Sequence, residues 1–594
     1  MLNSLVDSKH IQGTRNKEKV LLVACCLIIA IILLHIGFLE NKFIDGDDLT
    51  RIVQNPLIRN ITLTGFGRDI KGFFLYHYPS FLLTYYWGLI FSVWELNHIG
   101  FHFVSFLLHA LCTGLLFLLL IRMTNKLIPA LIGALFFGFH PLHCEAVNWI
   151  SRQDMMLTVF FGLLYLHMDF LKGSYARILS AIFVVLSIFV SPVSILLIPA
   201  RYFIAGDSGK TPSWKGTAAL IVLWAGTWGI KLPPVSPLKV TSGALRAVFW
   251  LAQDLFMPWK IRFMLPVLST GAWMVWGISM VLIAGVVVIA LKTGNKAWKL
   301  LGLGLLSFGL LHLFSDRFNG GYAYFSLLWT TLALGTAISE IEITAVSWKV
   351  GLSILAVAIF SAMAWMSYSR NGVWRNTDHL LTDSLKASPT DGWLLAMLGH
   401  YKAAFLNRKE TERIFKKVKT DSPEILCLKA KATHLLLDNA ESNRLFQELF
   451  RKYPQMKKDK FCLFDYAVLH VQMKKVEKAK KLFREVVGID PFFIYAWHNL
   501  GTLFFEEKKW TEGIKSLGKV LDIAPAYRPT LENMAIFYSE KGRWKKAASC
   551  IQTALASTSC HDTQRFYKGW LKALKAEKPY RYASIQWADL KPPG

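Results

Sequence analysis

Long apolar runs without the alternation of a β-strand dominate the first two-thirds of this 594-residue chain. The first run covers residues 20–39, and an α-helix needs about 20 residues to cross a hydrocarbon core of about 30 Å. Similar runs recur up to residue 368. A backbone inside lipid must satisfy its own hydrogen bonds, which an α-helix does within one segment. The sequence therefore predicts an all-α, polytopic membrane helix bundle.

Composition and charge agree with a membrane protein. Apolar residues make up 53% of the chain and charged residues only 18%, against about 25% in soluble domains. The net charge of +27 is spread along the sequence rather than gathered in one patch. A basic excess beside membrane segments is typical of orientation signals and of contact with anionic lipid. We expect membrane lipid as a partner and, because no zinc-finger or RNA-binding signature is present, no nucleic acid.

The apolar runs predict about eleven spans. Lys or Arg is abundant in most of the connections on the starting side, as the positive-inside rule expects. The aromatic stretch 76–96 would invert every later loop if it spanned, so we expect it to be interfacial or re-entrant. An odd count then places the C-terminal part outside. The eleven runs are residues 20–39, 99–121, 128–143, 153–171, 176–190, 193–205, 216–231, 271–291, 298–315, 322–339 and 349–368.

Regularly spaced prolines mark the C-terminal third. Pro389, Pro423, Pro454, Pro491 and Pro525 are separated by 34, 31, 37 and 34 residues. A helix–turn–helix unit of about 34 residues that ends in Pro is the tetratricopeptide (TPR) signature. We expect four or five repeats in an extracytoplasmic α-solenoid, whose concave surface would bind a peptide or protein. The predicted domains are a cytoplasmic tail over 1–19, a transmembrane domain over 20–369 with a large outer loop over 40–98, a repeat domain over 370–575 and a tail over 576–594.

Three carboxylates follow the first predicted span in the sequence Asp45-Gly-Asp47-Asp48. Adjacent carboxylates repel, so one of them can have a raised pKa and act as a general base. The alternative is a solvated loop in which Asp side chains form turns or cap a helix.

A second polar cluster lies in residues 140–154, where another predicted span ends. His140 and His143 have the spacing of two metal ligands, but Pro141 disfavours a regular helix between them. A polar pocket at the membrane surface is the favoured interpretation, and a structural ion network is the alternative. The charged members of this cluster are Glu145, Arg152 and Asp154.

Two histidines and an arginine complete the candidates. His102 and His109 are seven residues apart, which is two helical turns, so they share one face. An ionisable side chain within a span faces either a neighbouring helix or a functional cavity. Arg317, next to Asp316, would bind an anionic phosphate or pair with its neighbour. The eight cysteines contain no CxxC motif, and Cys550 with Cys560 would pair only in an oxidising compartment.

These clusters, in this order, resemble the transmembrane and tetratricopeptide-repeat O-mannosyltransferases and their bacterial relatives, over roughly residues 20–525. The segment His140-Pro-Leu-His143-Cys-Glu145-Ala-Val is the most specific match. Relatives commonly carry Lys-Glu where this chain has Ser191-Pro192. The other matching segments are Asp47-Asp48 with Ile52-Val53 and Asn55-Pro56, Gly100-Phe-His102 with Leu107-Leu-His109-Ala110, Phe256-Met-Pro-Trp259, and Trp374-Arg375.

The resemblance implies a GT-C fold and direct, inverting transfer of a mannose-like sugar from a polyprenyl phosphate to Ser or Thr of extracytoplasmic proteins. Asp47 or Asp48 would be the base, and Glu145 would orient the acceptor or share that role. The donor phosphate or the substrate would be bound by residues drawn from His102, His109, His140, His143, Arg152, Asp154 and Arg317, with Arg317 and His143 as the candidates for the phosphate. No cofactor is certain, no metal ligand is assigned, and a divalent ion stays open.

The resemblance leaves other points open. The expected location is a bacterial inner membrane with a periplasmic active face, and an endoplasmic reticulum membrane with a lumenal face is the alternative. A lipid or cell-wall glycan is an alternative acceptor. A non-catalytic anchor whose repeats assemble other proteins is an alternative of a different class.

Overall fold

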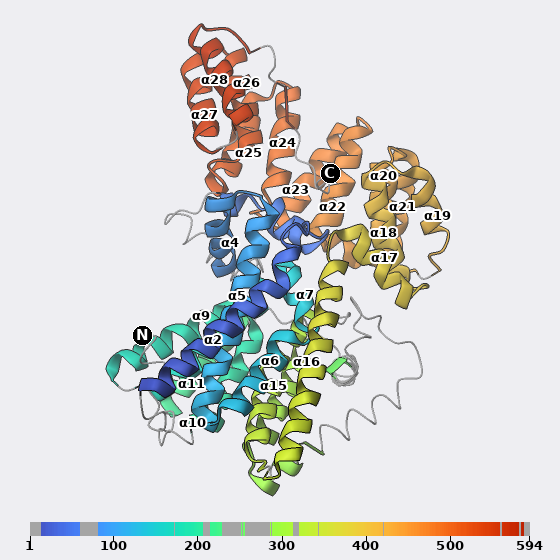
Figure 1. The fold of residues 1–594 in the computed structure, drawn as a ribbon. Coiled ribbons are helices and arrows are strands. Elements are labelled where there is room, and N and C mark those ends of the chain that lie inside the picture. Colours follow the sequence, from blue (N-terminus) through green and yellow to red (C-terminus); the bar gives the residue numbers. More distant parts are fainter. Residues whose placement is uncertain are drawn as a thin grey trace. The chain divides into compact units, whose positions relative to one another are not determined.

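The computed structural model is built from helices, with no strand among the residues it describes (Figure 1). It divides into two compact units. The membrane unit comprises residues 1–44 and 96–384, and the repeat unit comprises residues 45–95 and 385–594. The described residues are 14–59, 81–171, 173–205, 214–228, 292–312, 320–342, 344–419, 421–558, 561–580 and 584–586, with a few positions between 251 and 290.

The helices of the membrane unit follow the predicted apolar runs. They are α2 (Thr14–His35), α5 (His98–Thr124), α6 (Leu127–Phe139), α7 (His143–Asn148), α8 (Gln153–His167), α9 (Ser174–Val190), α10 (Leu197–Ala205), α11 (Trp214–Trp228), α14 (Lys296–His312), α15 (Ala323–Ser339) and α16 (Val346–Val373). Short turns η1 (Ile36–Phe38), η4 (Ile150–Arg152), η5 (Met168–Phe170), η6 (Pro192–Leu196) and η9 (Gly320–Tyr322) connect them, and α17 (Thr377–Ala387) contains the boundary between the units.

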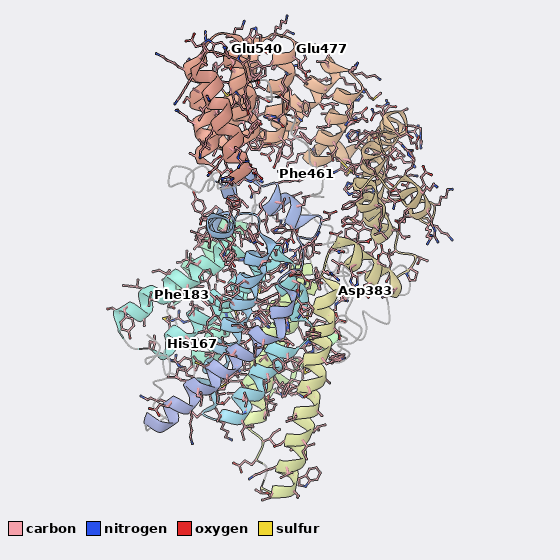
Figure 2. All side chains as sticks on the ribbon, turned by 45° about the horizontal axis from the view of Figure 1, so that its top comes forward. His167, Phe183, Asp383, Phe461, Glu477 and Glu540 are labelled. Atoms are coloured by element: carbon pink, nitrogen blue, oxygen red, sulfur yellow. A yellow bond between two sulfur atoms is a disulfide. The ribbon has the colours of Figure 1, made fainter. Side chains whose placement is uncertain are left out.

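Helix α5 is the central helix of the membrane unit and contacts α2, α6, α8 and α15. Asn97 caps its first turn by accepting a hydrogen bond from the Ile99 N–H at 3.0 Å. Asn125 ends it in the left-handed conformation, at φ 54°, which a short polar side chain tolerates. At the C-terminal end of α5, Arg122 donates to the carbonyl of His167 at 3.1 Å (His167 is labelled in Figure 2). These contacts fix the helix that carries two of the candidate histidines.

Three described helices are long and apolar enough to cross a membrane, against the eleven spans expected from the sequence. They are Lys17–Phe38, His98–Thr124 and Val346–Val373. The other apolar helices have 10–17 residues, which at about 1.5 Å per residue fall short of about 30 Å of hydrocarbon. The run at 271–291 lies mostly outside the described residues. Helix α16 exposes Trp348, Ile354 and Val357, a surface suited to lipid.

The repeat unit contains five successive helical hairpins in its described part. The turn inside each hairpin places one residue in the left-handed region, at φ between 56° and 66° (Leu406, Leu437, Lys474, Lys508 and Gly542). This shared geometry is the αL helix ending. The hairpins are α18 (Gly392–Ala404) with α19 (Arg408–Phe415), α20 (Pro423–Leu435) with α21 (Asn439–Lys452), α22 (Lys460–Gln472) with α23 (Val476–Ile489), α24 (Ile494–Glu506) with α25 (Trp510–Ile523), and α26 (Arg528–Glu540) with α27 (Trp544–Ala556), followed by α28 (His561–Lys575).

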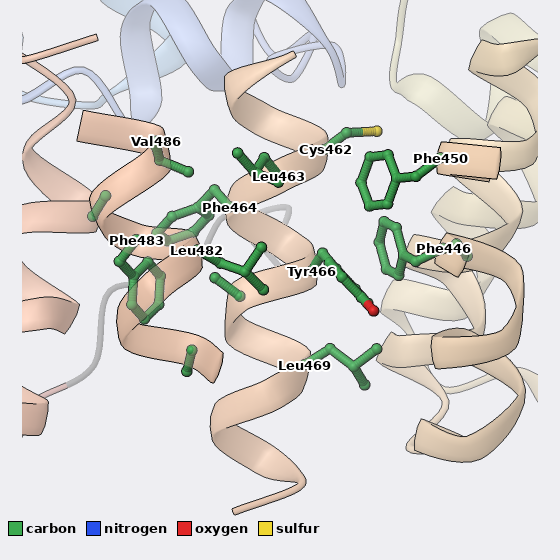
Figure 3. Packing of buried hydrophobic residues seen from close by; sticks show 14 of the residues in the cluster. Phe446, Phe450, Cys462, Leu463, Phe464, Tyr466, Leu469, Leu482, Phe483 and Val486 are labelled. Atoms are coloured by element: carbon green, nitrogen blue, oxygen red, sulfur yellow. The ribbon is translucent and has the colours of Figure 1, made fainter. Parts of the chain in front are cut away.

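Aromatic and aliphatic side chains fill the space between successive hairpins (Figure 3). Phe464 of α22 is fully buried, and its ring lies 5.6 Å from Phe483 and 5.3 Å from Phe493. Small residues let the two helices of a hairpin approach: a Cβ on Gly501 would meet Leu517 at 2.7 Å. Acidic side chains such as Glu477 and Glu540 lie at the surface of the hairpins (Figure 2). A single hairpin buries too little surface to be stable, so stacking supplies the core.

Residues 45–95 group with the repeats rather than with the membrane helices, although the sequence assigned them to the transmembrane domain. Leu57 packs against the buried side chains of Ile494, Val520 and Ile523. The described helical elements here are η2 (Leu49–Val53), η3 (Pro56–Arg59) and α4 (Phe81–Trp94). Helix α4 has 14 residues, too few to cross a bilayer of about 30 Å. The C-terminal boundary of the membrane unit falls after Ser384, not at 369.

A disulfide joins Cys427 of α20 to Cys462 of α22, whose Cα atoms are 6.5 Å apart. The sequence suggested Cys550 with Cys560 instead; Cys550 is a free thiol, and Cys560 lies outside the described residues. Because disulfides persist in oxidising compartments, we expect non-reducing peptide mapping of thiol-blocked native protein to recover the Cys427–Cys462 linkage and an alkylated Cys550. Alkylation of both Cys427 and Cys462 would place the repeat unit in a reducing compartment.

Candidate functional site

The acidic loop Asp45-Gly-Asp47-Asp48 lies in the repeat unit, and its three carboxylates have different surroundings. Asp48 is fully buried at the start of η2. Asp47 is partly exposed and forms an ion pair with Arg51 at 3.5 Å. Asp45 is half-buried, and its Oδ2 atom is withdrawn from solvent. The loop therefore does not behave as a uniformly solvated turn.

A cavity of about 400 Å³ separates this loop from the first hairpins of the repeat unit. Asp45 and Asp47 line one side, while His400 and the pair Lys431–Asp465, whose charged atoms are 2.6 Å apart, line the other. Burial and the positive charge of Lys431 lower the pKa of His400 to about 4, so its ring is neutral at pH 7. Asp48 does not line this cavity. Of the two predicted bases, only Asp47 therefore faces it.

Desolvation raises the pKa of Asp45 from 3.8 to about 7. This shift falls in the loop where the sequence allowed one carboxylate to have a raised pKa. The cause differs, because withdrawal from water dominates rather than repulsion between neighbouring carboxylates. A carboxylate with a pKa near the working pH has the ionisation behaviour of an efficient general base. The structure thus adds Asp45 to the candidate catalytic residues.

A cluster of three buried histidines lies within the membrane unit. His35 ends α2, His109 lies in the middle of α5, and His143 begins α7. The Nε2 atoms of His35 and His143 are 3.0 Å apart, and the rings of His109 and His143 are 4.4 Å apart. The structure thus brings His109 and His143 together. His102 and His140 are also buried but belong to other surroundings: the His140 Nε2 lies 3.2 Å from the carbonyl oxygen of Leu255.

The histidine cluster has a nitrogen arrangement that could hold a metal ion, since one ligand atom from each ring lies within 4.8 Å of the others. His35 Nδ1 lies 2.9 Å from the carbonyl oxygen of Ile31, a bond that directs the Nε2 lone pair towards His143. His109 Nδ1 lies 2.9 Å from the hydroxyl of Tyr324. Hydrogen bonding between neutral rings also accounts for the spacing of His35 and His143. His140, whose spacing from His143 is that of a second ligand, is not part of this cluster.

Glu145 and Arg152 hold the turn η9 in place. Glu145 accepts a hydrogen bond from the Gly321 N–H at 2.9 Å. The guanidinium of Arg152 lies 4.7 Å from the ring of Trp149 and 5.2 Å from that of Tyr322. These are positioning contacts, because each acts on the backbone or an aromatic ring of the unit itself. Asp154, also buried, accepts from the Met155 N–H at 2.8 Å in the first turn of α8.

A network of three asparagine side chains also holds α7 in place. Asn148 donates to Asn371 Oδ1 at 2.6 Å and accepts from Asn41 at 3.1 Å. All three side chains are buried, and together they tie the segment after η1 to α7 and α16. Sequence analysis missed Asn41 and Asn371, because asparagines far apart in the chain carry no spacing signal. It also missed His35, although an ionisable residue at the end of an apolar run is such a signal.

Arg317, expected to bind phosphate, lies outside the described residues. The turn that Glu145 and Arg152 hold begins at Gly320, three positions later in the chain. The structure therefore fixes the segment next to Arg317 without describing Arg317 itself.

Comparison with known proteins finds similarity to a repeat family and to a transferase. A family model for the tetratricopeptide repeat matches residues 462–493, the interval of α22 and α23. Protein O-mannosyl-transferase F38B6.6 of Caenorhabditis elegans is 24% identical over 430 residues, which covers 65% of this chain and 60% of that protein. The curated relative is a transferase. The chain thus spans about 60% of the length of this relative.

Two solved structures have short or distant likenesses to the chain. The MamA RS-1 ArsTM double mutant has 17% identity and a TM-score of 0.25, with coverage of 30% of this chain and 96% of that one. The APC/C hetero-tetramer Cut9-Hcn1 has 11% identity and a TM-score of 0.29, with coverage of 87% and 99%. Similarity at this level carries no argument about the fold. The relation to an O-mannosyl-transferase and the repeat match are the informative comparisons.

Proposed function

We propose that the chain is a membrane glycosyltransferase that moves a mannose-like sugar from a polyprenyl phosphate to Ser or Thr hydroxyls of extracytoplasmic proteins. The observation that carries the proposal is the cavity beside the acidic loop, where Asp45 has a pKa near 7. The distant similarity to an O-mannosyl-transferase supports the same reaction class. The proposed location is a bacterial inner membrane with the repeat unit in the periplasm, and the lumenal face of the endoplasmic reticulum is the alternative.

The chemistry needs a base for the acceptor and a leaving group that departs as a phosphate. In the proposed reaction Asp45 takes the proton of the hydroxyl, with Asp47 beside it in the cavity wall. The acceptor oxygen attacks the anomeric carbon, and the bond from that carbon to the phosphate oxygen breaks. Polyprenyl phosphate leaves with the bonding electrons, so the sugar inverts in one step. Bonds, electrons and the proton balance in this step without a metal ion.

The membrane unit would handle the donor. His109 and His143, with Arg317, are proposed to bind the lipid phosphate, because charge develops there in the transition state. His102, His140 and Asp154 are proposed to act on the donor site indirectly, without contact with the phosphate. Glu145 and Arg152 are proposed to position η9, which follows Arg317 in the chain.

The decisive experiment is turnover of labelled polyprenyl-phosphate mannose by the full chain in nanodiscs, with a Ser/Thr-rich acceptor peptide. Release of polyprenyl phosphate together with a labelled peptide supports the proposal. Release with label on lipid or glycan instead of peptide would change the acceptor. No turnover with a panel of lipid-linked sugars, from protein that still binds partner proteins, would favour a non-catalytic scaffold.

The two roles offered for Glu145 by the resemblance make opposite predictions for Glu145→Gln. The amide oxygen of Gln can accept the Gly321 N–H as the carboxylate does, but it cannot take a proton from an acceptor. We expect Glu145→Gln to keep kcat within about threefold of wild type, and Glu145→Ala to lower it by about tenfold or more because the bond is lost. Equal loss of turnover in both variants, at equal thermal stability, would make Glu145 a base.

A further inference from the structure

In the described part of the C-terminal tail, residues 584–586, hydrogen bonds to the main chain of Gln586 hold the segment on the repeat unit. The Gln586 N–H donates to Asn533 Oδ1 at 2.7 Å, and the Gln586 carbonyl accepts from Asn533 Nδ2 at 2.8 Å. His498 Nε2 lies 2.8 Å from the same carbonyl oxygen. One residue of the tail therefore has both of its backbone groups engaged. Asn533 lies on α26 and His498 on α24, the first helices of two successive hairpins.

The side-chain groups of Asn533 and His498 that bind Gln586 are themselves oriented by a second set of hydrogen bonds. The remaining N–H of Asn533 donates to Thr502 Oγ1 at 3.0 Å. His498 Nδ1 lies 2.8 Å from Thr530 Oγ1. If Nδ1 accepts from that hydroxyl, Nε2 carries the proton and donates to Gln586. Each donor and acceptor of the asparagine amide is then used, and the site is preorganised for one carbonyl and one N–H.

The hydrogen bonds from Asn533 and His498 do not involve the side chain of Gln586. The Gln586 amide group turns back to its own segment and donates to the carbonyl oxygen and the hydroxyl of Ser584, each at 3.1 Å. Asn533, His498 and Thr502 are buried with the tail in place. Without the tail, Asn533 Oδ1, one N–H of Asn533 Nδ2 and His498 Nε2 would lose these partners, which is unfavourable for any group that stays dry.

We propose that Asn533 and His498 form a binding site for the main chain of an extended polypeptide, and that residues 584–586 occupy it in cis. A cavity of about 690 Å³, bounded by Gln586, offers room for flanking side chains. Its walls include Arg59, Tyr495, Tyr527, Arg528 and Glu532. A polypeptide supplied from outside must displace the tail. Because Asn533 and His498 bind main-chain groups, the site selects for extended backbone rather than for a sequence. Its identity as an acceptor site rests on the proposed function; the binding itself does not.

The test uses the membrane-embedded chain and a fluorescent peptide with the sequence of residues 581–590. One protein form is the full chain and the other ends after Tyr580, which keeps the stacking of Tyr580 on Trp570. We expect the shortened form to bind the peptide at least about tenfold more tightly than the full chain, since its site is vacated. Asn533→Ala in the shortened form should lower the affinity by about tenfold or more, because two hydrogen bonds are lost.

Peptide variants supply a control that does not depend on the folding of Asn533→Ala. Methylation of the Gln586 backbone nitrogen removes the N–H that Asn533 accepts, and it should weaken binding as strongly as the protein variant does. Gln586→Ala in the peptide should bind as the parent does. Equal binding of the N-methylated and parent peptides, or no binding to the shortened form, overturns the proposal. Neither outcome depends on sugar transfer, so failure of the transferase assay leaves this result unaffected.

Discussion

Replacement of Asp45 by Asn is expected to lower the turnover of polyprenyl-phosphate mannose by about 10²–10⁴-fold, the usual contribution of a positioned general base. Asn has nearly the same volume as Asp, so the cavity wall keeps its shape. It cannot accept a proton from the acceptor hydroxyl. The measurement is kcat for sugar transfer to a saturating acceptor peptide by wild type and variant in the same nanodiscs.

The same carboxylate fixes the expected pH dependence. The base is the ionised form, and the pKa of Asp45 is about 7. Turnover by wild type should therefore rise about tenfold per pH unit below pH 7 and level off above it. The residual turnover of Asp45→Asn should lack this limb. A wild-type profile that is flat between pH 5 and pH 8 would contradict Asp45 as the base.

The stability of the fold supplies an independent readout, because it should fall with rising pH where turnover should rise. The pKa of Asp45 is raised in the folded state, so between about pH 4 and pH 7 the folded chain holds a proton that the unfolded chain has released. The free energy of unfolding of the repeat unit therefore falls as pH rises through this window. Asp45→Asn removes that penalty. We expect the variant to lose activity and to have a higher Tm than wild type at pH 8.

Asp47→Asn is the matched control. The Asp47 carboxylate is 31% exposed and forms an ion pair with Arg51 at 3.5 Å, so it is not withdrawn from water as Asp45 is. Its replacement should change the pH profile little and should not raise the Tm at pH 8. If instead Asp47→Asn abolishes turnover while Asp45→Asn keeps it, the base is Asp47, as the sequence resemblance implies.

Phe464→Ala is expected to destabilise the repeat unit by about 3–5 kcal/mol. Phe464 is fully buried and lies against Phe483 of α23 (Figure 3). Its ring also contacts Phe493, just before α24. Truncation would leave a cavity that the rigid helices can close only in part. Each hairpin depends on its neighbours, so the loss should be concentrated in the adjacent hairpins rather than spread over the chain.

Hydrogen exchange resolved by peptide can locate this loss in the intact protein. Peptides of α22, α23 and α24 should exchange faster in Phe464→Ala by a factor that corresponds to several kcal/mol, while α5 should be unchanged. Phe405→Ala is the control, since Phe405 is 50% exposed, and its effect should stay within about 0.5 kcal/mol. Uniform faster exchange across the whole repeat unit would show that the hairpins unfold as one cooperative block.

Local patterns in the sequence predicted many elements of this structure. Proline spacing placed the hairpins, because each unit repeats one helix–turn–helix geometry and one left-handed turn. Apolar runs located the membrane helices, but their ends depend on breaks such as Pro192 and on tertiary packing, so run length overstated how many helices are long enough to span. The match of His140 to Glu145 with a known motif marked this segment, but it predicted neither the short helix α7 nor its contacts.

The missed parts of the candidate sites all depend on distance in the chain. His35 meets His143 across 108 residues, and Asn148 meets Asn371 across 223. The raised pKa of Asp45 results from burial by hairpins that begin more than 300 residues later, which no local count of carboxylates contains. Gln586 is bound to Asn533 through its main-chain atoms, so no side-chain pattern in the sequence predicts this contact.

The repeat unit is made from two stretches of chain separated by residues 96–384. At about 5–20 residues per second, a ribosome needs on the order of 15–60 s to synthesise the intervening chain. During that interval the acidic loop has been made, but the hairpins that wall its cavity do not yet exist. Asp45 must spend this time in water with an ordinary carboxylate pKa. The protonation behaviour proposed for catalysis is therefore acquired late in biosynthesis, which would keep a partly made chain from acting on the proteins around it.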